Sequence, residues 1–186
     1  MASTLKVNTI QGATNTTTTV KTNGGTDALT IDTSGRILTP ARPAFRAFRS
    51  SNTGNVNYQG GNAAATDFVF DSESYDIGGN YNTSNGKFTA PIAGLYHFNA
   101  NIYGSGTEDG ANMWCSVYIF VNGVQASRTI EDPQGGNYGM PQISDNLQLT
   151  AGQEVTIRLG SGADTSINVS GSSDGSITNF SGFLIG

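Results

Sequence analysis

The sequence predicts an all-β protein built as a two-sheet jelly roll, and three observations lead to this prediction. Short apolar and aromatic segments recur at a spacing of about 8 to 12 residues, which is typical of antiparallel strands. Turn residues separate them, and Gly alone accounts for 25 of the 186 residues, well above the usual share. No segment shows the period of an amphipathic helix. We therefore expect a sandwich of about ten antiparallel strands.

Residues 1–42 differ in composition from the rest of the chain. They are rich in Thr and Asn, and no aromatic residue occurs before Phe45. Alternating apolar and polar residues predict three short strands, over residues 5–10, 28–32 and 36–38. Pro40 and Pro43 mark the end of this part. Because strands this short cannot bury a face alone, we expect an extended, strand-rich segment for attachment or trimerisation. The alternative is a flexible Thr-rich linker.

Residues 43–186 are expected to form the jelly roll itself. The expected strands are residues 44–50, 55–59, 67–70, 88–91 continuing into 94–103, 113–121, 124–130, 143–149, 154–159 and 177–185. Pro91 is tolerable within a strand only at an edge or a bulge. Asn122 and Gly123 predict a two-residue hairpin turn. The apolar run 113–121 indicates a strand buried on both faces, within the sandwich or at a subunit contact.

The densest aromatic pattern lies between Phe70 and Phe98. It consists of Phe70, Asp76, Tyr81, Phe88, Gly94, Tyr96 and Phe98. In type and spacing these positions resemble the signature of the C1q globular head, a trimeric jelly roll related to the tumour necrosis factor fold. The final aromatic position of that signature is Ala100 in this chain. Further matches at 113–124, 143–159 and 180–186 extend the resemblance over about residues 44–186.

The resemblance implies a homotrimer, and the apolar content gives a physical motive for one. The expected strands hold more apolar side chains than one thin sandwich can hide, so a threefold contact would bury the excess aromatic residues. The residues expected at the trimer contact and in the core are Phe48, Tyr96, Phe98, Trp114, Tyr118 and Phe120.

Charge is distributed unevenly along the chain. Residues 1–49 carry six basic and two acidic residues, a net charge of +4, and the remainder carries three basic and twelve acidic residues, a net charge of −9. Three such acidic heads would repel nucleic acid. No apolar stretch is long enough for a membrane helix, and the first residues do not resemble an export signal. We expect neither a nucleic-acid partner nor membrane insertion.

No catalytic site is expected. The chain has no serine elbow, no phosphate-binding loop and no zinc motif. Its paired carboxylates, such as Glu131 and Asp132, lie in or beside Gly- and Ser-rich loops, which do not desolvate a carboxyl group as a glycosidase requires. His97 is the only histidine and Cys115 the only cysteine, so one chain cannot supply a zinc cage. Cys115 lies in an apolar run and is expected to be buried.

Calcium is the one cofactor left open. The resemblance implies it for some members, because several C1q-like heads bind calcium, and hard cations take carboxylate and carbonyl oxygens from loops. The candidate ligands are Glu108, Asp109 and Asp145. The alternative is a solvated acidic rim without bound metal.

Three long polar loops, at residues 105–112, 131–140 and 160–175, are the candidates for recognition, since binding residues gather on loops of rigid scaffolds. The candidate receptor contacts are Glu131, Asp132, Tyr138 and Met140. The alternative is that these loops only connect strands.

Two interpretations of function follow. The stretches LKVNTIQ and ALTIDTSGRIL resemble head-proximal segments of viral fibre and tail proteins. The first interpretation is therefore a non-enzymatic structural protein in a virion, a homotrimeric bacteriophage tail fibre or capsid-decoration protein. It would attach to other virion proteins through Leu5, Lys6, Val7 and Ile10, and its head would face outward for host attachment to a surface glycan or protein. The alternative is a secreted C1q- or tumour-necrosis-factor-like ligand or lectin.

Overall fold

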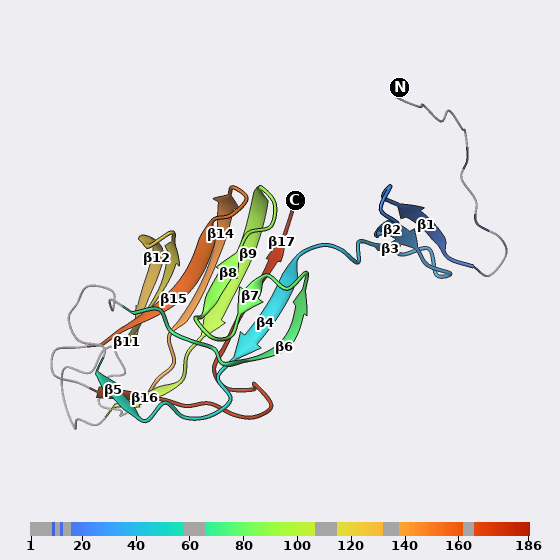
Figure 1. Cartoon of the computed structure of the whole chain (residues 1–186). Coiled ribbons are helices and arrows are strands. Elements are labelled where there is room, and N and C mark those ends of the chain that lie inside the picture. The colour runs from blue at the N-terminus through green and yellow to red at the C-terminus, as the bar shows by residue number, and fades with distance from the viewer. Residues whose placement is uncertain are drawn as a thin grey trace. The chain divides into compact units, whose positions relative to one another are not determined.

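The structure, a computed structural model, describes residues 9, 12, 16–57, 66–106, 115–131, 138–161 and 166–186. Every strand pair in this part of the chain is antiparallel, and no helix occurs in it (Figure 1). It therefore also contains no helix that could span a membrane. The predicted all-β class is confirmed. The chain divides into two compact units, Met1–Arg42 and Pro43–Gly186.

The first unit contains one small sheet in the order β1-β2-β3. Its strands are β1 (Thr18–Lys21), β2 (Asp27–Ile31) and β3 (Ile37–Leu38). The Asp32 carboxylate closes the turn between β2 and β3, since it accepts hydrogen bonds from the backbone N–H groups of Ser34 and Arg36, each at 2.9 Å. Its hydrogen bonds to Arg36 hold the pKa of Asp32 below its usual value. The predicted attachment residues Leu5, Lys6, Val7 and Ile10 lie outside the described residues.

Two five-stranded sheets form the body of the second unit. The first, called the β9 sheet here, has the order β14-β9-β17-β4-β6. Its strands are β4 (Ala44–Phe48), β6 (Ser72–Ile77), β9 (Gly94–Asn101), β14 (Gln142–Leu149) and β17 (Asn179–Leu184).

The second, called the β11 sheet, has the order β12-β11-β15-β8-β7. Its strands are β7 (Tyr81–Asn82), β8 (Lys87–Thr89), β11 (Cys115–Val121), β12 (Val124–Glu131) and β15 (Glu154–Ser161). A smaller sheet, β13-β10-β16-β5, contains β5 (Asn55–Asn57), β10 (Gly104–Gly106), β13 (Tyr138–Gly139) and β16 (Ser166–Val169).

Aromatic rings from both large sheets interlock in the core between them. Phe180 of β17 lies at the centre, with its ring centroid 5.0 Å from that of Phe45 and 5.9 Å from that of Phe98. Phe45 in turn stacks on Phe88 of the opposite sheet at 4.9 Å. Ala100, which stands where the C1q signature has its final aromatic, is fully buried in the same core. The two sheets therefore face one another as a sandwich.

The residues of the C1q-like signature are structural. Its five aromatic side chains are buried in the core. Asp76 Oδ2 accepts a hydrogen bond from the backbone N–H of Tyr81 at 2.8 Å and so fixes the turn between β6 and β7. A Cβ atom on Gly94 would lie 2.6 Å from Leu184 Cδ1 and 3.1 Å from the Gly186 carbonyl oxygen, so a larger residue there would have to displace the Leu184 side chain. The signature residues therefore hold the two sheets and their turns in place.

Three expectations about strands differ from the structure. Residues 67–70, expected as a strand, form none, and the strand in this region is β6. The expectation of one interrupted strand over residues 88–103 is wrong, because β8 pairs with β15 in one sheet and β9 pairs with β14 and β17 in the other. The chain crosses between the sheets at residues 90–93. β6 was not predicted, since Ser, Glu and Asp have low strand propensity. β6 is a strand because its backbone forms hydrogen bonds with β4 at the edge of the sheet, which outweighs its low strand propensity.

The predicted hairpin turn between β11 and β12 is confirmed. Asn122 and Gly123 have φ angles of 48° and 77°, and positive values at both positions are what a type I′ turn requires. This turn matters for the surface described below, because it places the Asn122 side chain next to β15.

Cys115 is buried, as the sequence predicts. Burial, followed by the nearby Glu131 carboxylate, raises its pKa from 9.0 to about 11. The thiol is neutral below its pKa, so at pH 8 the folded protein holds about 100-fold less thiolate than an exposed cysteine of ordinary pKa. We expect a thiol reagent to modify native protein at least about 100-fold more slowly than protein in denaturant. Equal rates in the two conditions would show that Cys115 is accessible.

Candidate functional site

The outward face of the β9 sheet is a surface that no other sheet covers in the part of the chain that the structure describes. In β9, Tyr96, Phe98 and Ala100 point into the core and are fully buried. The alternate residues of the same strand, Leu95, His97, Asn99 and Asn101, therefore point outward.

Neighbouring strands extend this surface in register. Phe183 and Asn146 both pair with His97, and Ser181 and Ser144 both pair with Asn99. We call this surface the amide face, and its residues are Leu95, His97, Asn99, Asn101, Gln142, Ser144, Asn146, Gln148, Asn179, Ser181 and Phe183. None of these side chains is acidic, and His97 is the only basic one, although the chain carries 9 basic and 14 acidic residues. Arg46 of β4, which pairs with Ser181, borders the face. Depletion of charge is the compositional mark of an interface core.

The amide face has an apolar end and a polar end. At the apolar end, Phe183 is 46% exposed, and its ring centroid lies 5.2 Å from that of His97. Tyr75 and Ile77 of the edge strand β6, which β4 separates from β17, are also exposed. Exposed aromatic and aliphatic side chains beside one another are the kind of surface that a partner buries.

At the polar end, amide side chains bond to one another along the sheet. Asn101 Nδ2 donates to Asn99 Oδ1 and to Asn179 Oδ1, each at 3.2 Å. His97 Nδ1 lies 2.8 Å from Asn146 Oδ1, and its Nε2 lies 3.4 Å from Ser144 Oγ. Each amide has more donors and acceptors than these bonds use. The face can therefore pair with a second polar surface without breaking its internal bonds.

Most of the residues predicted for the trimer contact are enclosed by their own chain. Tyr96 and Phe98 are fully buried in the sandwich core. Phe48 is buried beneath the loop at Gly175, where a Cβ atom would lie 2.7 Å from Phe48 Cγ. Trp114 lies outside the described residues. These three described side chains serve the scaffold, and they offer another chain almost no surface.

Tyr118 and Phe120 point outward from the β11 sheet, yet both are buried. The guanidinium of Arg128 lies 5.0 Å from the centre of the Tyr118 ring, and that of Arg158 lies 4.1 Å from the centre of the Phe120 ring. The double-sided burial predicted for this strand is thus found, with arginine side chains of neighbouring strands as the outer cover.

Phe183, Tyr75 and the outward asparagines were not among the residues predicted for a functional surface. The signal was present, because placing Tyr96 and Phe98 inside forces His97 and Asn99 outside. The predicted contact residues were instead aromatic ones, and in β9 these are the inward residues Tyr96 and Phe98.

Three of the four predicted receptor residues, Glu131, Tyr138 and Met140, lie among the described residues. The Met140 backbone N–H donates to the Glu131 carboxylate. Tyr138 is exposed and stacks on Tyr103, with ring centroids 5.8 Å apart. Met140 is exposed as well, and Asp132 lies outside the described residues. Their role in binding stays a prediction.

The calcium prediction also stays untested. Glu108 and Asp109 lie outside the described residues. Asp145 accepts hydrogen bonds from the Ser127 hydroxyl and from the Asn146 backbone N–H. Among the described residues, no three His, Cys, Asp or Glu side chains lie close enough together to hold a metal ion.

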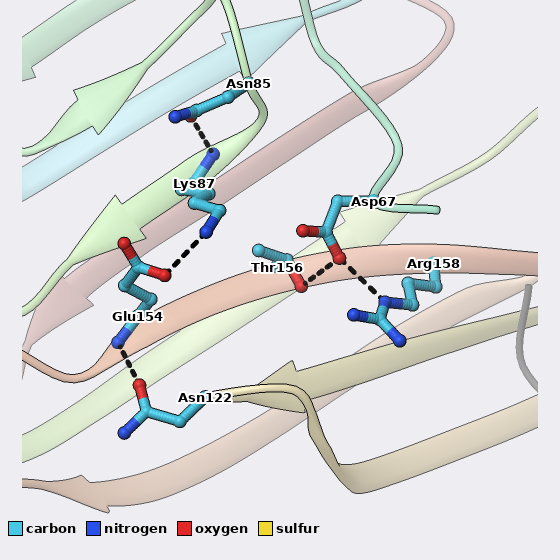
Figure 2. A network of polar contacts seen from close by, with 7 residues as sticks. All are labelled: Asp67, Asn85, Lys87, Asn122, Glu154, Thr156 and Arg158. Carbon is cyan, nitrogen blue, oxygen red and sulfur yellow. Dashed lines mark hydrogen bonds and ion pairs between the residues drawn. The ribbon is translucent and has the colours of Figure 1, made fainter. Parts of the chain in front are cut away.

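A network of polar and charged side chains, shown in Figure 2, lies on the outer face of the β11 sheet, whereas the amide face lies on the other sheet. Asp67 Oδ1 accepts hydrogen bonds from Thr156 Oγ1 at 2.9 Å and from Arg158 Nε at 2.7 Å. Beside this cluster, Lys87 Nζ lies 2.7 Å from Glu154 Oε2. The hydrogen bond that Lys87 donates to the Glu154 carboxylate raises the pKa of Lys87.

Comparison with known proteins decides the family. The sequence pattern described as the C1q domain matches residues 44–185. The chain belongs to the C1q domain family. The predicted resemblance is confirmed, and the match spans the whole sandwich.

Individual C1q relatives match a shorter part of the chain. The mouse and human proteins named complement C1q tumor necrosis factor-related protein 2 are each 32% identical over 90 residues, which is 48% of this chain. The matched part spans 28% of the mouse protein and 29% of the human protein, less than a third of each.

The globular domain of zebrafish complement 1qA protein has the same fold. It superposes with a TM-score of 0.55 at 18% identity, over 78% of this chain and 98% of that domain. The predicted C1q- and tumour-necrosis-factor-like jelly roll is thereby confirmed.

The predicted virion location is wrong. The relatives found are animal C1q proteins from mouse, human and zebrafish, and nothing among them points to a phage fibre or a capsid. The similarity of residues 1–42 to fibre segments rests on short words rich in Thr and Asn, and composition of this kind recurs in unrelated chains. The match to the C1q domain spans far more residues.

Proposed function

We propose that this protein is a non-enzymatic binding protein, a C1q- or tumour-necrosis-factor-like ligand or lectin of the secreted type, that works as a homotrimer. The amide face is the observation that carries the proposal, because it is uncharged apart from His97 and partly apolar on an otherwise acidic protein. Membership of the C1q family and the names of the mouse and human relatives support the ligand class. This interpretation replaces the viral structural role.

The chemistry of the amide face suits contact with copies of itself. In a closed threefold assembly, residues near the axis meet their own copies. Three carboxylates or three ammonium groups would repel one another there. An asparagine amide both donates and accepts hydrogen bonds, so copies of Asn99 or Asn101 can pair with each other. Copies of Phe183 can pack together and remove apolar area from water.

Three carboxylates of the sandwich make structural hydrogen bonds and ion pairs, which supports a non-enzymatic function. Asp71 accepts from the Ser50 backbone N–H at 2.8 Å, and Asp67 binds Arg158. Asp76 fixes the backbone of Tyr81. Each of these carboxylates ties a loop or edge strand to the sandwich, which is a structural task.

Replacing Phe183 with lysine tests the homotrimer. We expect the variant to be monomeric, because three ammonium groups brought together at the contact would each lose hydration without a partner. The trimer should weaken by about 1,000-fold or more in dissociation constant. Light scattering coupled to size-exclusion chromatography measures the mass, and circular dichroism checks that the fold is kept.

Val124→Lys is the matched control. Val124 is 70% exposed and lies on β12, in the other sheet. This variant should keep the mass of the native protein. A Phe183→Lys variant that keeps its oligomeric mass would place the contact elsewhere and would remove the amide face from the proposal.

A further inference from the structure

We propose that a groove on the outer face of the β11 sheet binds a neutral saccharide in each subunit. The inference rests on the proposed binding function and names its ligand class. No catalytic step is involved, since the groove would only hold the sugar.

The groove has the size of a small-molecule site. Its volume is about 420 Å³, and such sites usually measure about 300–1,000 Å³. The lining residues are Asp67, Lys87, Asn122, Gly123, Glu154, Thr156 and Arg158. Four separate stretches of chain supply them: the segment before β6, strand β8, the β11–β12 turn and strand β15. The walls are therefore anchored in the rigid sheet and its tightest turn.

The Arg158 side chain is held in one orientation. Its Nε donates to Asp67 Oδ1 at 2.7 Å, and its guanidinium lies over the Phe120 ring. Figure 2 shows both terminal nitrogens of Arg158 without a hydrogen bond to any residue drawn, and no bond from another described residue reaches them. A fixed guanidinium with unused N–H groups is a ready donor pair for a ligand.

Acceptors and further donors lie beside it. Asp67 uses Oδ1 for both of its bonds, and Glu154 uses Oε2 for Lys87. The second oxygen of each carboxylate has no partner among the described residues. Asn122 accepts the Glu154 backbone N–H on Oδ1 at 2.9 Å, which leaves its amide nitrogen as a donor (Figure 2). Every one of these side chains is preorganised by a bond that a ligand need not replace.

The charge of the groove selects the ligand class. Two carboxylates and two cationic groups line it, so their formal charges cancel. Neither a strongly anionic nor a strongly cationic ligand gains from such a balance. Unused acceptors and donors alternate within one site, and a hydroxyl group can donate and accept at once. A molecule that carries several neighbouring hydroxyls is therefore the best complement, which is a saccharide without charge.

The groove is independent of the proposed trimer contact. It lies on the outer face of one sheet, whereas the amide face is the outer face of the other. A monomeric Phe183→Lys variant should therefore bind the same sugar with unchanged affinity per subunit. The two proposals can fail separately.

The test is a titration of the ¹⁵N-labelled chain with four free sugars: glucose, galactose, mannose and N-acetylglucosamine. Each sugar is added to about 50 mM, because a dissociation constant of about millimolar order is expected for a single sugar. We expect at least one sugar to shift the backbone amide signals of Asn122, Gly123 and Glu154. Glu154→Gln should weaken that binding about tenfold, since it removes a charged acceptor. Its loss of an exposed ion pair should leave the fold intact.

Glu73→Gln is the control, because Glu73 is an exposed carboxylate on β6 of the other sheet; it should leave binding unchanged. The proposal is overturned if no sugar shifts these signals, or if Glu154→Gln binds as well as native protein. It is also overturned if inorganic sulfate shifts them and no neutral sugar does. Sugar binding by a native chain that is monomeric would contradict only the trimer, and a native trimer without sugar binding would contradict only the groove.

Discussion

Replacing Phe180 with alanine is expected to lower the free energy of unfolding by about 3–5 kcal/mol. Phe180 is fully buried, and its ring lies within 5.0 to 6.1 Å of the ring centroids of Phe45, Phe70, Phe98 and Tyr81. These neighbours come from distant parts of the chain and are held by both sheets, so they cannot collapse into the cavity. A domain of this size is typically stable by only about 5–15 kcal/mol. Urea denaturation measures the change.

Ile130→Ala is the control for Phe180→Ala. Ile130 is 52% exposed on β12, so truncation there should change stability by less than about 1 kcal/mol. A Phe180→Ala variant no less stable than Ile130→Ala would show that the aromatic core does not hold the two sheets together.

Replacing Gly86 with alanine is expected to destabilise the fold by about 3 kcal/mol or more, for two reasons that add. Gly86 has a φ of +75°, which costs a residue with a side chain about 1–2 kcal/mol. A Cβ atom there would also lie 2.5 Å from the Phe68 carbonyl oxygen and 3.2 Å from Val69 Cα. Both are backbone atoms that cannot rotate away, so the turn or the neighbouring segment must shift.

Gly79→Ala separates the two causes. Gly79 has a φ of +66° and lies in the neighbouring turn, but a Cβ atom there would meet nothing within 4 Å. It should therefore show only the conformational cost of about 1–2 kcal/mol. Equal losses for the two variants in thermal or urea unfolding would mean that the close approach of Gly86 to Phe68 is not important for stability.

The sandwich could be predicted from local sequence because its signals are local. Tyr96 and Phe98 lie two residues apart, and that spacing alone places both on one face of a strand. Asn122 and Gly123 specify their turn without help from the rest of the chain. The signature from Phe70 to Phe98 pointed to the C1q family, and the family match confirms it.

Alternation within β9 indicates that His97 and Asn99 face outward, but the rest of the two surfaces depends on cross-strand pairing and could not be predicted. Tyr118 reads as an exposed contact residue until Arg128 and Arg158 are placed opposite it, on two strands that flank β11. The exposure of Phe183 follows from the pairing of β17 with β4 and β9. The groove joins Asp67 to Arg158 across 91 positions of sequence. No periodicity within a single strand contains this information.

The location was misjudged for a similar reason. The virion location was predicted from residues 1–42, which resemble viral fibre segments mainly in composition. This part of the chain contains no specific motif that argues against that prediction. The sandwich gave a specific pattern that spans residues 44–185. Specific spacing of chemically distinct residues outweighs shared composition, and here the two pointed to different kinds of protein.

The mass of the unmodified 186-residue chain in solution decides whether this protein is a homotrimer. Sedimentation velocity at about 1–100 µM would show whether assembly depends on concentration. We expect one species at three times the chain mass of 19.4 kDa, held together through the amide face. A single species at 19.4 kDa across that range would contradict it, because the amide face, with the half-exposed ring of Phe183, would then be left open to water.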